Sequence, residues 1–143
     1  MLAEYYVGNR TRLYEKLTAG SIVAVFSGEN TWKTGDEDYM FFADRNFVYL
    51  TGLKTSRQAI LLAAKEADGS VHEQVYILPS DAYAERWTGA RVKPQEAQEI
   101  SGISDIRFVD ALRHWLSADV TRNCILICTV LQQIVQIVLH TVY

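Results

Sequence analysis

Short apolar runs bounded by turn residues constrain this chain more than any other feature of its sequence. Such runs occupy residues 22–26, 59–64 and 74–78, and each contains β-branched or aromatic residues. Runs of this length are typical of buried strands. The last two flank residues 67–70, which read Ala-Asp-Gly-Ser, a turn signal that predicts a hairpin. The chain is therefore expected to fold around a β-sheet.

Further strands and helices alternate with these runs. The remaining strands are expected at residues 47–50, 106–109 and 123–130, with a short extended segment at 39–42. A first helix is expected at residues 9–19, capped by Asn9. Further helices are expected to begin after Ser80, at Pro94 (ending at Gly102), after Asp110 and at Leu131. This alternation predicts an α/β fold, with a mixed β-sheet of about five to six strands flanked by helices. The 143 residues fit a single domain, residues 1–143.

The composition argues against several classes of protein. The sequence has 14 basic and 17 acidic side chains and a net charge of −3, which argues against a nucleic-acid-binding protein. Its two cysteines make no disulfide framework, and both are expected to be buried thiols in a reducing compartment. The N-terminal residues lack the basic and apolar segments of a secretory signal. We therefore expect a cytoplasmic protein.

The last part of the chain has a composition of its own. Every charged residue lies within residues 1–122, and none lies within residues 123–143. A membrane span is one reading of this segment, but three glutamines and a histidine interrupt it, so no membrane association is expected. Aliphatic residues repeat at helical spacing from Leu131 onward, so we expect this atypical tail, residues 119–143, to pack on the sheet or on a partner subunit. Because the chain stops inside an apolar stretch, it is interpreted as part of a longer protein.

No complete catalytic or metal site is recognised in the sequence. His72, His114 and His140 lack ligand partners at the spacing of a metal site, and they are expected to be solvent-facing or edge residues. A Gly-x-Ser-x-Gly nucleophile turn and a phosphate-binding loop are both absent from the sequence. Acidic residues 36–38 and Asp44 leave one alternative open, a small metal-dependent hydrolase, although adjacent acids in a glycine-containing loop are usually solvated.

Two local patterns are more informative. Residues 44–52 read Asp-Arg-Asn-Phe-Val-Tyr-Leu-Thr-Gly and follow an aromatic segment that begins at Tyr39. The second pattern, Glu-Arg-Trp-Thr-Gly-Ala-Arg, places Trp87 near the end of a helix and Arg91 in the loop after it. Tyr83 and Trp87 are four residues apart, so both are expected on the inner face of this helix. Trp87 then either packs in the core or forms a platform at an interface or substrate mouth, where Trp and Arg are favoured.

These patterns, in this order, resemble the N-terminal domain of the Xaa-Pro aminopeptidase and prolidase family, which is related to creatinase. The resemblance covers residues 9–118 and begins with a first helix that carries an arginine (Arg10 or Arg12), followed by Gly-Ser and a hydrophobic strand. It continues with an acid, an aromatic strand that ends in Leu-Thr-Gly, a Pro-x-Asp segment and a Glu-x-Trp-x-Gly-x-Arg segment. The matching residues of these motifs are Gly20, Ser21, Asp44, Phe47, Tyr49, Leu50, Thr51, Gly52, Pro79, Asp81, Glu85, Trp87, Gly89 and Arg91.

The resemblance implies a creatinase/aminopeptidase P N-terminal-like fold. In this family the domain precedes a larger catalytic domain of the pita-bread fold, which holds two manganese or cobalt ions and cleaves the bond before proline. That catalytic domain is absent from this sequence, so the resemblance supplies no catalytic residue, metal ligand or cofactor for the chain itself. It implies instead that the domain packs subunits into a homo-oligomer and narrows access for proline-containing peptides. Trp87, Arg91 and Tyr39 are the candidates for this rim or interface.

One other kind of function remains open. The alternative to an accessory domain of a peptidase is a self-standing binding or dimerisation module of the same fold, with no catalytic partner. A catalytic reading frame directly downstream in the gene would distinguish the two.

Overall fold

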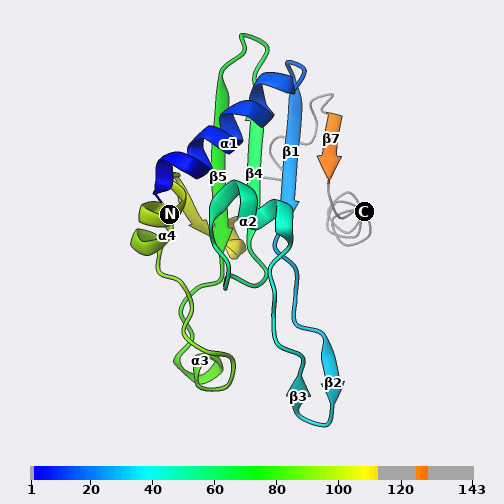
Figure 1. Ribbon diagram of the computed structural model, residues 1–143, viewed down its shortest axis with the longest axis vertical. Helices are drawn as coiled ribbons and strands as arrows, with labels where there is room; N and C mark the ends of the chain where they lie inside the picture. The colour runs from blue at the N-terminus through cyan, green and yellow to red at the C-terminus, as the bar shows by residue number, and fades with distance from the viewer. Residues whose placement is uncertain (1, 113–124, 129–143) are drawn as a thin grey trace.

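A five-stranded mixed sheet organises the part of the chain that the computed structural model describes, residues 2–112 and 125–128 (Figure 1). Its strands are β1 (Ser21–Phe26), β4 (Ile60–Lys65), β5 (Val71–Ile77), β6 (Ile106–Phe108) and β7 (Ile125–Cys128). They lie in the order β6-β5-β4-β1-β7, with β1–β4 and β4–β5 antiparallel and β1–β7 and β5–β6 parallel. The sheet confirms the predicted α/β fold, and the pairing of β4 with β5 confirms the predicted hairpin.

Alternating side chains build an apolar core on each face of this sheet. The helices that cover the first face are α1 (Ala3–Lys16), α2 (Arg45–Thr51) and α4 (Pro94–Ser101). Beneath them lie Val23 and Val25 of β1, and Figure 1 shows α1 and α2 crossing this face. On the opposite face Ile22 and Leu62 pack in a second cluster with Leu112. Because β1 is buried on both faces, its sequence after Ser21 is continuously apolar rather than alternating.

A buried arginine ties the covering helices to the sheet. Arg10 of α1 is 1% exposed, and its Nη1 donates to the carbonyl oxygens of Leu50 at 2.8 Å and Ser101 at 2.9 Å, which lie in the last turns of α2 and α4. Its Nε donates to Oε2 of Glu73 on β5 at 2.9 Å, and the Tyr14 hydroxyl donates to the same oxygen at 2.8 Å. Hydrogen bonds from a charged donor are stronger than neutral ones. One side chain therefore fixes α1 against two helices and a strand.

The first helix is longer at its start than its sequence pattern predicts. It begins at Ala3 rather than at Asn9 and ends at Lys16. Asn9 is therefore not the cap; it lies inside the helix, buried, where its side-chain nitrogen donates to the Tyr49 carbonyl at 2.8 Å. This long-range hydrogen bond explains a buried asparagine that local capping rules would place at a helix end.

The strand predicted at residues 47–50 is wrong, because these residues form helix α2. The Asp44 carboxylate accepts from the backbone N–H groups of Asn46 and Phe47, which caps the first turn. Gly52 ends the helix in the left-handed region, with φ of +76°. Aromatic and β-branched residues favour strands only weakly. A cap at each end and the burial of Phe47 therefore make these residues helical.

The second half of the chain follows the predictions more closely. Helix α4 starts with Pro94 in its first turn and stops at Gly102, as predicted, and β6 and β7 lie within their predicted ranges. A single 3-10 turn (Val109–Ala111) stands where the helix after Asp110 is predicted. The continuation of that helix and the tail from Leu131 onward lie outside the described residues. Within the described residues, no helix has the length and apolar character needed to cross a membrane.

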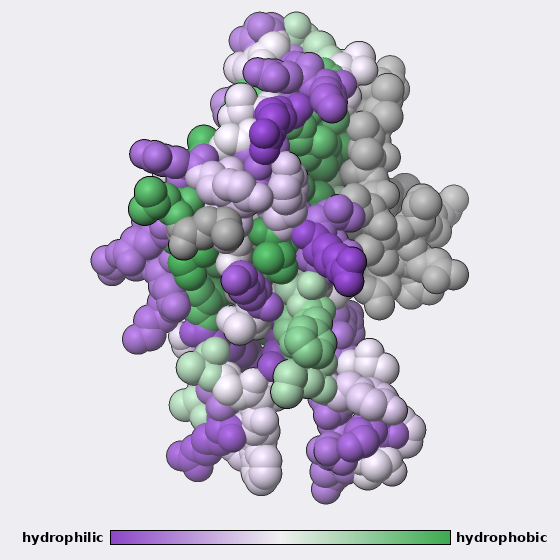
Figure 2. Space-filling model, in the orientation of Figure 1, coloured by the Kyte–Doolittle hydropathy of each residue, from purple (hydrophilic) through white to green (hydrophobic). Residues whose placement is uncertain are grey.

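Two segments project from one end of the sheet, at the bottom of Figure 1. One is a hairpin of β2 (Trp32–Thr34) and β3 (Glu37–Asp38), for which the sequence pattern predicted no strand. The other is α3 (Ala82–Thr88), which Asp81 caps in place of Ser80. Figure 2 shows the two projections as separate lobes below the main body. The segment 39–42, predicted as extended, has no regular strand and returns the chain from the hairpin to α2.

Candidate functional site

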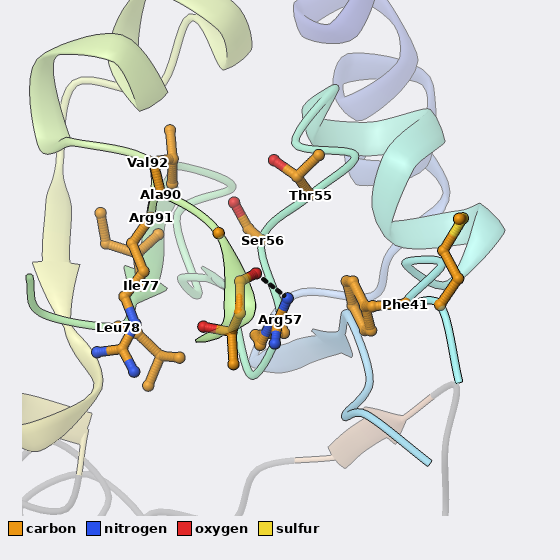
Figure 3. Close-up of a pocket in the computed structure, with 12 residues that line it drawn as sticks. Phe41, Thr55, Ser56, Arg57, Ile77, Leu78, Ala90, Arg91 and Val92 are labelled. Carbon is orange, nitrogen blue, oxygen red and sulfur yellow. Dashed lines mark hydrogen bonds between the residues drawn. The ribbon is translucent and has the colours of Figure 1, made fainter. Parts of the chain in front are cut away.

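A groove of about 290 Å³ lies between the bases of the two projections (Figure 3). Four segments that are distant in sequence build it: the return from the hairpin, the loop between α2 and β4, the end of β5, and the loop between α3 and α4. The residues that line it are Met40, Phe41, Thr55, Ser56, Arg57, Ile77, Leu78, Thr88, Gly89, Ala90, Arg91 and Val92. Its walls therefore combine apolar and polar residues, and both of its charged residues are arginines.

Each arginine is held in place by a backbone carbonyl. Arg57 Nη2 donates to the Thr88 carbonyl at 2.8 Å, and its guanidinium lies 5.6 Å from the centre of the Phe41 ring. Arg91 Nη1 donates to the Pro79 carbonyl at 2.6 Å. Figure 3 shows Arg57 and Phe41 facing the segment that carries Arg91 across the groove. No acidic side chain is among the lining residues, so the groove has a positive potential.

Two buried polar atoms of the groove have no hydrogen-bond partner among the described residues. They are the Oγ of Ser56, whose residue is 8% exposed, and the Nε of Arg91. A buried donor without an acceptor costs about 1–3 kcal/mol, so native structures rarely leave one unpaired. Both atoms are enclosed by the chain itself, so a molecule in the groove does not reach them.

The structure separates the three residues predicted for a rim or interface. Arg91 lines the groove, whereas Trp87 and Tyr39 lie outside it, on the helical projection and directly after the hairpin. Trp87 is 79% exposed and Tyr39 is 57% exposed. The prediction that Tyr83 and Trp87 face inward is wrong, and so is the core-packing alternative for Trp87, because α3 has no buried residue. Helix α3 projects from the sheet, so it has no inner face to bury.

Trp87 and Tyr39 belong to a larger exposed set at the projecting end. We call these residues the apolar tips: Trp32, Tyr39, Met40 and Phe42 on or after the hairpin, and Tyr83 and Trp87 on α3. Large apolar side chains gathered at one end of a domain are typical of a contact surface. The sequence shows these residues as apolar, but their exposure follows only from the projection of both segments.

The acidic residues near the hairpin have local structural roles. Asp44 caps α2, Glu37 pairs with Lys33 at 3.0 Å, and Asp38 accepts from Asn30 at 3.0 Å. Within residues 2–112 and 125–128, no group of three or more histidine, cysteine or acidic residues is placed to hold a metal ion. These contacts give the metal-dependent hydrolase alternative no support. His72 is exposed, as expected, and the other two histidines lie outside the described residues.

No sequence pattern indicated that the loop between α2 and β4 forms one wall of the groove. Ser56 and Arg57 lie in a loop that matches no motif, and they reach the loop after α3 only through the tertiary fold. Arg57 and Thr88, which are hydrogen-bonded, are 31 positions apart in the sequence. No local pattern could reveal that contact.

The fold and the groove define an α/β domain with an open, positively charged groove and an exposed apolar end. Comparison with known proteins then identifies the family. The sequence pattern described as "Aminopeptidase P, N-terminal domain" matches residues 6–126. The chain belongs to this family of aminopeptidase P N-terminal domains.

Solved structures agree with this assignment. A Bacillus anthracis protein assigned as an aminopeptidase P superposes with a TM-score of 0.84 at 29% identity, covering 98% of this chain and 35% of that protein. Aminopeptidase P from Escherichia coli, solved with the inhibitor Pro-Leu, superposes with a TM-score of 0.73 at 23% identity, covering 82% and 26%. At that lower identity the likeness supports the shared fold alone.

Curated relatives are much longer proteins. Xaa-Pro aminopeptidase of Escherichia coli strain K12 is 28% identical over 94 residues, which are 66% of this chain and 21% of that protein. Intermediate cleaving peptidase 55 of Saccharomyces cerevisiae is 27% identical over 123 residues, which are 84% of this chain and 24% of that protein. The chain thus spans about a fifth to a quarter of these relatives, in which the matching domain is one part of a larger protein.

Proposed function

We propose that this chain serves as a non-catalytic accessory domain of an Xaa-Pro aminopeptidase-type enzyme. In this role it assembles with a catalytic domain of the same polypeptide and with other copies, and it restricts which peptides reach the active site. The observation that carries the proposal is the exposure of the apolar tips at one end of the domain. The names of the relatives, Xaa-Pro aminopeptidases among them, support an aminopeptidase over a prolidase.

The physical case for a contact surface rests on the hairpin and on α3. A two-stranded hairpin is only marginally stable in water, and the residues of β2 and β3 are all exposed. Exposed tryptophan and tyrosine side chains are the residue types that contribute most to binding free energy in protein interfaces. Burial of Trp32 and Trp87 against a partner would stabilise both projections, so we propose that these projections insert between domains or subunits.

The proposed restriction of access uses the three predicted rim residues. Tyr39 and Trp87 extend on the two projections, and Arg91 lies between their bases in the groove. Two rigid aromatic side chains that flank an opening would admit an extended peptide and exclude a folded protein. Proline-containing peptides are the proposed substrates of the whole enzyme, because proline fixes the backbone in an extended conformation.

The proposed parent enzyme uses metal ions in its catalytic domain. Two manganese or cobalt ions are proposed for that domain, where they would activate water for peptide hydrolysis. Residues 2–112 and 125–128 of this chain offer no ligand set for such ions. A cytoplasmic location and a homo-oligomeric enzyme complete the proposal.

A chimaera tests assembly and access together. Residues 1–126 would replace the matching domain of the Escherichia coli Xaa-Pro aminopeptidase, with Trp87→Ala as the test variant and Leu2→Ala, also highly exposed but on the N-terminal side of α1, as the control. We expect the chimaera to assemble and to prefer short Xaa-Pro peptides. Trp87→Ala should weaken assembly or the preference for short peptides about tenfold. Equal behaviour of the two variants would count against the proposal.

A second measurement uses the chain alone. Purified chain with added manganese or cobalt is expected to leave Xaa-Pro dipeptides and tripeptides intact. Proline-specific cleavage that a chelator abolishes would overturn the accessory role. The self-standing binding module remains the competing function, and an intact catalytic frame downstream in the gene would exclude it.

A further inference from the structure

We propose that the groove between the two projections binds a carboxylate that is attached to an apolar group. Three features of the groove carry this inference: its charge, the free N–H groups of its arginines and the apolar part of its lining. It goes beyond the accessory role proposed above, and it concerns binding to this chain by itself.

The charge of the groove selects an anion. Arg57 and Arg91 are its charged lining residues, and its walls contain no carboxylate that could neutralise them. The adjoining residues Lys54 and Lys93 add positive charge at its edges, where both are exposed. An excess of one sign in a cleft with low-dielectric walls concentrates ligands of the opposite sign.

The hydrogen-bonding groups of the groove call for an acceptor. A guanidinium N–H can only donate, and Arg91 uses Nη1 for the Pro79 carbonyl, which leaves its Nη2 group for a ligand. Arg57 uses Nη2 for the Thr88 carbonyl, which leaves its other N–H groups for a ligand. A carboxylate has two acceptor oxygens and matches the planar donors of arginine better than a spherical anion does.

The arginines are already positioned for such a ligand. The Thr88 carbonyl and the Phe41 ring hold Arg57, and the Pro79 carbonyl holds Arg91. Side chains that are fixed before binding lose little rotamer freedom when the ligand arrives. The groove is therefore a prearranged site and not a chance meeting of two flexible surface arginines.

The walls and the volume of the groove define the rest of the ligand. Phe41, Ile77, Leu78 and Val92 give it an apolar lining, which favours an apolar group over an inorganic anion. Its volume of about 290 Å³ is at the small end of ligand sites and fits about one large side chain with its carboxylate. Two sources offer this chemistry: the C-terminal residue of a peptide, and an Asp or Glu beside an apolar residue in a docking polypeptide.

A titration of the 143-residue chain tests the proposal directly. N-acetyl-leucine is the probe, N-acetyl-leucinamide is its uncharged match, and backbone amide NMR signals report the affected residues. We expect N-acetyl-leucine to shift the signals of residues 55–57 and 88–92 and to bind at least about tenfold more tightly than the amide, the effect of a lost charge-assisted hydrogen bond. Equal binding of the two probes, tighter binding of inorganic phosphate, or shifts confined to other residues would overturn the proposal.

Three variants locate the site. Arg57→Gln and Arg91→Gln should each weaken N-acetyl-leucine binding by about tenfold. Arg86→Gln on α3 removes an equal charge outside the lining and should leave binding unchanged. Each variant is compared only if its amide spectrum retains the dispersion of the folded chain. An equal loss in Arg57→Gln and Arg86→Gln would reduce the effect to net charge and refute a built site.

Two further peptides distinguish the source of the carboxylate. Ala-Pro-Leu with a free C-terminus carries the terminal carboxylate, and acetyl-Leu-Glu-Leu-amide carries only the side-chain carboxylate. Tighter binding of the first assigns the groove to peptide ends, and tighter binding of the second assigns it to a docking segment; binding of neither refutes the inference. Because these titrations need no catalytic domain, their failure leaves the assembly role of the apolar tips intact.

Discussion

Replacement of Arg10 with methionine is expected to be the most damaging single substitution in α1. Methionine keeps a long, unbranched side chain, so the volume of the site is nearly filled, but it removes every hydrogen-bond donor. The carbonyl oxygens of Leu50 and Ser101 would lose their side-chain donor, and Glu73 would keep only the Tyr14 hydroxyl. The loss therefore falls on α1, α2, α4 and β5 together.

The magnitude follows from the groups left unpaired. A hydrogen bond from a charged donor contributes about 1.5–3 kcal/mol, and two carbonyls lose one each. Breaking a buried ion pair from one side costs about 3–5 kcal/mol. The side chain of Glu73 is 27% exposed, so water can solvate part of its charge. The lower end of the range for a broken ion pair therefore applies. Because these contributions belong to one side chain they overlap and are not added, so we expect the free energy of unfolding to fall by about 3 kcal/mol.

Urea unfolding, followed by circular dichroism, measures this loss. With a slope of about 2 kcal/mol per molar urea, the midpoint should fall by about 1.5 M. Arg12→Met is the matched control: Arg12 is an exposed arginine of the same helix that donates only to Asn9 and the Tyr49 hydroxyl among the described residues, so its loss should cost about 1 kcal/mol. In the double variant Arg10→Met/Glu73→Leu, removal of the second charge should restore part of the stability. Equal losses in Arg10→Met and Arg12→Met would refute the assignment of Arg10 as a buried brace.

Two further predictions concern the same face of the domain. Burial raises the pKa of the Tyr14 phenol above its ordinary value, so the contribution of this residue to stability is complete below about pH 10 and is lost as the pH rises toward the folded-state pKa. In unfolding experiments at rising pH, Tyr14→Phe should therefore reduce the loss of stability at alkaline pH. Tyr83→Phe, at an exposed site, should not. Gly52→Ala should cost about 2 kcal/mol or more, because the added Cβ would lie 2.5 Å from the Tyr6 ring at a φ of +76°. Gly69→Ala, with φ of +88° and open space around it, should show only the backbone cost of about 1 kcal/mol in the same urea assay.

The sheet could be predicted from the sequence because its strands carry their own signals. Residues 22–26, 59–64 and 74–78 are apolar over the length of a strand, and the turn at 67–70 joins the last two. Helix α4 was equally clear, since Pro94 and Gly102 mark its start and its end. In these elements local preference and tertiary packing agree.

Helix α2 could not be predicted because local preference and tertiary packing disagree there. The aromatic residues within Arg45–Thr51 suggest a strand. The two signals that favour a helix, Asp44 as cap and Gly52 as stop, flank these residues and were outweighed by them. The deciding contacts are distant in sequence: Arg10 and Asn9 donate to the carbonyl oxygens of Leu50 and Tyr49 at the end of α2. A pattern confined to residues 44–52 contains neither donor.

Helix α3 exposes a second limit of sequence patterns. The spacing of Tyr83 and Trp87 correctly places both residues on one face of a helix. It does not show whether that face packs on the same chain or on another molecule. Here the sheet ends before α3 begins, so the face points into solvent and Trp87 is 79% exposed. Because both projections extend beyond the sheet, the apolar tips have no core of their own to pack on, which is why we propose that another domain or subunit covers them.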